Sequence, residues 1–152
     1  MNKNINEYNL LNDILFNLEK QHIYFDSNTN FHLAIFTSDV IRKIKDGYKT
    51  YESRWSKFRH RPYKRISNGD VVFIKESNGP VVAYFVAEDI SFEKNDNPYL
   101  MMKKYYSKTG FELKQYSSNV GCYITFMKME KLTFVNAFKV IKKDCQTWVC
   151  LN

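Results

Sequence analysis

The stretch Gly47-Tyr48-Lys49-Thr50-Tyr51-Glu52-Ser53-Arg54 follows a short predicted helix and is predicted to begin a strand. Alternate side chains of a strand share a face, which places Thr50, Glu52 and Arg54 on one side and Lys49 on the other. Both faces therefore carry groups that ionise or form hydrogen bonds, as in a strand that crosses the mouth of a polar cleft. An edge strand protected by its charges against aggregation is the alternative.

The composition is that of an ordinary one-domain globular protein, with 152 residues, 44% hydrophobic and 26% charged. No apolar run approaches the roughly 20 residues that span a bilayer, and residues 1–4 lack the layout of a secretory signal. The three cysteines and three histidines form no CxxC pair and no metal-ligand spacing. We therefore expect a cytoplasmic protein without a membrane span, a metal or another cofactor.

The net charge of +7 and the aromatic content of 16% favour a polyanionic partner. Positive charge binds nucleic acid through counterion release, and aromatic faces stack on unpaired bases. Cations and aromatic rings are both concentrated in residues 53–69, and no acidic residue occurs between Glu52 and Asp70. The cations there are Arg54, Lys57, Arg59, Arg61, Lys64 and Arg65, interleaved with Trp55, Phe58 and Tyr63. We expect residues 57–65, the basic loop, to hold phosphates; the alternative is a solvated loop whose rings pack under the sheet.

The periodicity of apolar residues predicts an α+β protein. The predicted helices are residues 6–21, 38–46, 98–106 and 111–116, with Ser38 as the cap of the second. The predicted strands are residues 31–36, 47–54, 71–76, 81–88, 122–129, 133–140 and 147–151. His32 is expected to be a hydrogen-bonded histidine of the interior or of an edge, and Trp148 to lie in the core, with ligand contact as the alternative. Many short strands in one mostly antiparallel sheet indicate a closed or half-closed barrel decorated by helices.

The pattern Gly47-x-Lys49-x-x-Glu52-x-Arg54 after a helix, followed by Gly69-Asp70 leading a strand, resembles the ASCH domain, a family of PUA-like β-barrels. The resemblance covers about residues 31–151. It implies a barrel domain at residues 31–152, with residues 1–30 as an N-terminal helical extension. It also implies that a cleft lined by Lys49, Thr50, Glu52 and Arg54 binds RNA or a nucleotide-like ligand.

We therefore expect a protein that binds RNA, or another single-stranded or modified nucleic acid. The alternative implied by the resemblance is a small hydrolase, because some ASCH proteins are amidohydrolases of acylated nucleosides and others are described as ribonucleases. In those amidohydrolases the lysine that matches Lys49 is catalytic.

With Lys49 and Glu52 both in the cleft, a neutral lysine takes a proton from water and the carboxylate shuttles it. This requires a bulge or twist near Thr50 to bring the two side chains together. Two further interpretations stay open: an ordinary ion pair between Glu52 and Arg54, and an interaction module whose basic face meets an acidic protein.

Overall fold

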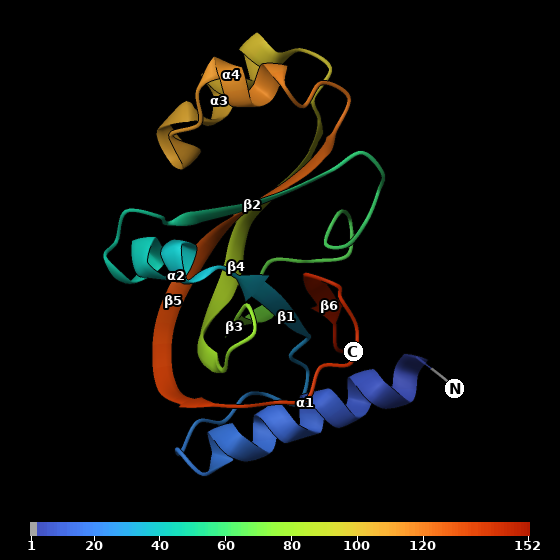
Figure 1. Cartoon of the computed structure of the whole chain (residues 1–152), viewed down its shortest axis with the longest axis vertical. Coiled ribbons are helices and arrows are strands. Elements are labelled where there is room, and N and C mark those ends of the chain that lie inside the picture. The colour runs from blue at the N-terminus through green and yellow to red at the C-terminus, as the bar shows by residue number, and fades with distance from the viewer. Residues whose placement is uncertain (1–2) are drawn as a thin grey trace.

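The computed structural model describes residues 3–152, with side chains from residue 5 onward, as one curled sheet with helices around it (Figure 1). The strands are β1 (Phe31–Phe36), β2 (Tyr51–Ser56), β3 (Val71–Glu76), β4 (Val81–Lys94), β5 (Tyr123–Phe138) and β6 (Trp148–Cys150). The helices are α1 (Lys3–Glu19), α2 (Ser38–Lys45), α3 (Pro98–Thr109) and α4 (Leu113–Ser117). Residues 1–2 of the predicted extension lie outside the described residues. The predicted fold class, an α+β half-barrel, is confirmed.

The six strands of the sheet follow the order β2-β5-β4-β3-β1-β6. β1 and β3 are parallel, with Phe31 opposite Val71, and the other neighbouring strands are antiparallel. Both begin with four consecutive buried residues, as expected for strands covered on both faces. The strands β2 and β6 stand at the two ends of this order, so curling of the sheet brings two edges toward one another (Figure 1).

The strands β4 and β5 form one long curved ribbon, which corrects two predictions. β4 continues past Glu88 to Lys94, and the two strands predicted at 122–129 and 133–140 are a single strand. Register shifts interrupt the pairing of β4 with β5, and the pairing continues after each shift. The backbone takes positive φ at Asp89 and at Lys131. Such irregularities bend a ribbon without ending it, so residues 123–138 form one strand rather than two.

The helix α1 packs against one end of the sheet (Figure 1). Its buried side chains Leu10, Leu11, Ile14 and Leu18 share a cluster with apolar residues of β1, β3 and β6. The predicted helix is confirmed, although it spans Lys3–Glu19 rather than residues 6–21. The division at residue 30 stays a prediction.

The helices α3 and α4 cover the far end of the β4–β5 ribbon (Figure 1). Tyr105 of α3 stacks on Phe126 of β5, with ring centroids 3.8 Å apart. Asn97 caps α3 by accepting a hydrogen bond from the amide of Leu100 at 3.2 Å. The N-cap of α2 is Thr37 rather than the predicted Ser38, because the Thr37 hydroxyl accepts from the third amide of the turn.

Candidate nucleic-acid interface

The segment before β2 turns back onto the end of α2 instead of beginning the strand. Gly47 has a φ of +80°, a conformation that favours glycine, and the amides of Tyr48 and Lys49 both donate to the Lys43 carbonyl. The strand therefore starts at Tyr51 rather than at Gly47, which corrects the prediction. Because Lys49 precedes the strand, it is not bound by strand alternation, and its side chain reaches the face that carries Glu52.

Glu52 is a buried carboxylate with a cation at each oxygen. The side chain is 6% exposed, with Lys49 Nζ 3.5 Å from Oε1 and Arg54 Nη2 3.5 Å from Oε2. The amide of Ser53 also donates to Oε1 at 2.7 Å. A buried charge is tolerated when it is paired and hydrogen-bonded, and Glu52 meets both conditions. Glu52 and Arg54 share one face, as alternation predicts, whereas Thr50 is exposed beside them.

Arg54 connects the two edges of the curled sheet. From β2 its guanidinium donates to the Ile35 carbonyl at 3.0 Å and to the Thr147 carbonyl at 3.4 Å. It also lies over the rings of Phe36 and Trp148, 4.8 and 5.3 Å from their centroids. Since β2 and β6 are not neighbours in the sheet, this side chain joins edges that no strand pairing joins.

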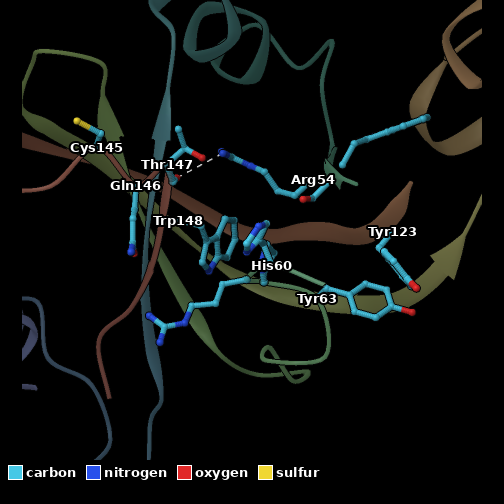
Figure 2. A pocket seen from close by; sticks show the side chains of 12 residues that line it. Arg54, His60, Tyr63, Tyr123, Cys145, Gln146, Thr147 and Trp148 are labelled. Atoms are coloured by element: carbon cyan, nitrogen blue, oxygen red, sulfur yellow. Dashed lines mark hydrogen bonds between the residues drawn. The ribbon is translucent and has the colours of Figure 1, made fainter. Parts of the chain in front are cut away.

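A cleft of about 630 Å³ opens beside Arg54, between the basic loop and the segment that leads into β6 (Figure 2). Its lining residues are Arg54, Trp55, Ser56, His60, Arg61, Pro62, Tyr63, Tyr123, Cys145, Gln146, Thr147 and Trp148. This set, the main cleft, contains two arginines, a histidine and four aromatic rings, and no carboxylate. Such a lining favours an anionic ligand with a flat, stackable part.

The aromatic rings of the main cleft contact one another and rings outside the cleft. Tyr63 meets Tyr123 edge-on at 5.1 Å between centroids. Trp55 is partly buried: its ring centroid lies 5.1 Å from that of Tyr116 of α4, and it also lines the main cleft. Trp148 is 4% exposed, which confirms that it is interior, and it lines the cleft (Figure 2).

The basic loop is anchored at its apolar residues and exposed at its cations. Pro62 is buried, and Ile66, which follows the loop, belongs to the main core cluster. The five cations of the loop are exposed: Lys57, Arg59, Arg61, Lys64 and Arg65. The guanidinium of Arg59 lies 5.2 Å from the Tyr123 ring centroid, and Arg61 pairs with Glu7 of α1 at 3.6 Å. The loop thus places Arg61 in the lining of the main cleft and Arg59 over one of the rings of that lining.

His32 supports Trp148 from inside the barrel. Its Nε2 lies 2.8 Å from the Asp70 carboxylate, and its Nδ1 accepts from the indole N–H of Trp148 at 3.2 Å. Burial lowers the pKa of His32, although the hydrogen bond and the charge of Asp70 act in the opposite direction. A neutral ring with its proton on Nε2 satisfies both contacts, so of the two expected positions, interior or edge, His32 takes the interior one with both nitrogens hydrogen-bonded.

The predicted site residues fall into two adjoining groups. Arg54 and Arg61 line the main cleft, whereas Lys49, Thr50 and Glu52 stand beside it and are not part of its lining. Besides Ser56 of β2, sequence reasoning missed the lining residues Tyr123, Cys145, Gln146 and Thr147. The last four come from the start of β5 and from the approach to β6, far along the chain from the basic loop, and no local pattern marks them. Within residues 3–152, no cluster of three or more histidine, cysteine or acidic side chains is arranged to hold a metal ion.

No family model and no curated protein matches the sequence of this chain. Its structure is similar to that of the ASCH protein from Zymomonas mobilis, with a TM-score of 0.59 and 13% identity over 80% of this chain and 87% of that one. A mutant of the same protein gives a TM-score of 0.60 over 80% of this chain and 88% of that one, also at 13% identity. A DUF984 protein from Enterococcus faecalis V583 gives 0.54 at 9% identity over 86% and 90%. The chain therefore has the fold of ASCH-domain proteins, as the sequence resemblance predicts.

Proposed function

We propose that this protein binds single-stranded RNA, with one unpaired nucleotide in the main cleft and the neighbouring phosphates on the basic loop. The observation that carries the proposal is the lining of the cleft, which combines aromatic rings with arginines and has no carboxylate. A volume of about 630 Å³ lies within the range of small-ligand sites. A concave site of this kind suits a base that is not stacked in a duplex.

The chemistry of the side chains indicates which of them would contact the base and which the phosphates. Tyr63, Tyr123 and Trp55 offer faces or edges on which a base stacks, and stacking tolerates every base. Arg59, Arg61 and the other exposed loop cations neutralise phosphates, and an arginine fork binds two phosphate oxygens at once. Gln146 and Thr147 place amide and hydroxyl groups at the opposite wall. The affinity of such a site comes mainly from backbone charge and stacking, with modest base preference.

Charge-removal variants test the proposal. Arg59→Gln together with Arg61→Gln removes two cations from the rim, and Lys43→Gln together with Lys45→Gln removes two from α2, which lies across the sheet from the loop (Figure 1). In fluorescence-anisotropy titrations with a labelled RNA octamer, we expect the loop variant to bind at least tenfold more weakly, since hydrogen bonds to charged groups are worth about 1.5–3 kcal/mol. The α2 variant should bind within twofold of the parent. Equal losses of affinity in both variants would mean that the loop acts only through the net charge of the protein, and would contradict the proposal.

The second candidate function is a small hydrolase acting on an acylated nucleoside or on RNA. One observation favours it: Lys49 Nζ pairs with Glu52 Oε1 at 3.5 Å, a separation that must shorten to about 2.6–3.2 Å for direct proton transfer. The second oxygen of Glu52 faces Arg54, and neither Lys49 nor Glu52 lines the main cleft, which suits a structural ion pair better.

The hydrolase hypothesis is tested by incubating the protein with N-acylated cytidine and with RNA, and separating the products. Turnover by the parent that disappears in Lys49→Met would establish the hydrolase; no turnover together with tight binding supports the RNA-binding function.

No helix among the described residues has the length and apolar character to cross a bilayer. We place the RNA-binding function in the cytoplasm.

A further inference from the structure

A second cleft, of about 530 Å³, lies on the other side of Arg61. Its lining residues are Glu7, Tyr8, Arg61, Arg65, Cys150, Leu151 and Asn152. This set, the second cleft, lies between α1 and the basic loop. The function proposed above uses its two arginines for phosphates but places no nucleotide in the cleft itself.

Two observations join the clefts into one path. Arg61 lines both of them, so they meet at its side chain. The opposite wall is one continuous piece of chain, because residues 145–148 line the main cleft and residues 150–152 line the second. That piece contains β6, which ends the sheet and pairs only with β1 among the described strands. The two clefts therefore lie in succession along the free edge of β6.

We propose that a single RNA strand occupies both clefts, running from the main cleft across Arg61 into the second cleft. This inference rests on the proposed RNA-binding function and extends its site to several nucleotides. Arg61 lies at the junction and contacts the phosphate between the two subsites, and Arg65 contacts the next phosphate. Tyr8 on α1, which is 64% exposed, supplies a ring for a second base. The helix α1 is then part of the binding site as well as of the core.

Glu7 modulates this path. Its carboxylate pairs with Arg61 at 3.6 Å, with side chains 23% and 41% exposed respectively. A phosphate that approaches Arg61 from the second cleft must displace Glu7, and the two anions repel each other. Removal of the Glu7 charge should therefore strengthen the binding of an RNA long enough to reach this cleft. It should affect a single nucleotide in the main cleft much less.

Oligouridylates of increasing length test the inference: uridine 5′-monophosphate and chains of two, four and six nucleotides, titrated against the full chain. We expect affinity to rise through at least four nucleotides. Arg65→Gln should weaken hexamer binding by about tenfold and reduce the slope of log K against log salt by about 0.7, the share of one phosphate on a single strand. It should weaken the binding of the monophosphate much less than that of the hexamer. Lys43→Gln is the control for net charge, and Tyr8→Ala should cost the hexamer about fivefold or more.

Glu7→Gln should change the affinity in the opposite direction. It should strengthen the binding of the hexamer several-fold and leave the binding of the monophosphate nearly unchanged. If affinity stops rising at one or two nucleotides, or if Arg65→Gln weakens all lengths equally, the two-cleft path is wrong while the RNA-binding function stands. If no oligomer binds at any length, the proposed function fails and the path falls with it.

Discussion

Replacement of Arg54 by methionine should destabilise the protein more than loss of any other cation near the site. Methionine keeps an unbranched apolar stem of similar reach and removes the guanidinium. The carboxylate of Glu52 then keeps only Lys49 as a cationic partner, and the Ile35 carbonyl loses a 3.0 Å hydrogen bond. The contact between the β2 edge and the β6 edge is lost at the same time.

The size of the effect follows from the exposure of the groups. Breaking a fully buried ion pair costs about 3–5 kcal/mol, because it leaves an uncompensated charge. The Arg54 side chain is 20% exposed and Lys49 stays on the other Glu52 oxygen, so water and the remaining cation screen part of that cost. We expect the free energy of unfolding to fall by about 2–3 kcal/mol, including the hydrogen bond. For a domain of this size, that corresponds to a decrease in Tm of about 4–12 °C.

Equilibrium unfolding in urea, followed by fluorescence of the two tryptophans, measures this change. Trp148 is a suitable reporter because its ring centroid lies 5.3 Å from the guanidinium carbon. Arg54→Lys should recover only part of the loss, since an ammonium lacks the planar fork that reaches two carbonyls. In a double-mutant cycle with Glu52→Gln we expect a coupling of about 1 kcal/mol or more. A cost below about 0.5 kcal/mol for Arg54→Met, or strict additivity in the cycle, would refute the role of Arg54 in joining the two edges.

Two further predictions concern the interior of the barrel. Burial lowers the pKa of His32 from 6.5, so the unfolded chain binds a proton that the folded chain excludes; the free energy of unfolding should fall as pH drops below about 6.5, by at most about 1.4 kcal/mol per pH unit. His32→Asn should flatten this part of the stability profile, and an unchanged slope would assign the pH dependence to other groups. Ile14→Ala on the buried face of α1 should cost about 2–5 kcal/mol, because Ile14 is 0% exposed. Ile5→Ala, at a position 56% exposed on the same helix, should cost less than about 0.5 kcal/mol, and similar costs for the two would contradict the packing of α1 on the sheet.

The strands with the clearest local signals were predictable. The bounds of β1 and β3 agree with the sequence prediction, because each is a short apolar run and the turn Gly69-Asp70 introduces the second. The start of β2 and the continuity of β5 were not predictable in the same way. They depend on amides that turn back onto α2 and on pairing that resumes after an irregularity, and both are contacts between distant parts of the chain.

The candidate site was predictable in part for the same reason. The basic loop and Arg54 stand out by charge density, and the ion pair between Glu52 and Arg54 follows from alternation along one strand. The opposite wall of the main cleft comes from residues 145–148, and only the curling of the sheet brings it to the loop. Lys142 illustrates the limit of charge counting. Its side chain is 8% exposed and pairs with Asp144, so it does not add to an exposed basic surface.

The most direct test of the RNA-binding account is the salt dependence of binding to a single-stranded RNA octamer, measured beside a duplex of the same sequence. If each of the five loop cations neutralises one phosphate, log K should fall against log salt with a slope of about −3.5, and the single strand should bind more tightly than the duplex. A slope shallower than about −1, or tighter binding to the duplex, would contradict an unpaired strand held by the main cleft and the basic loop.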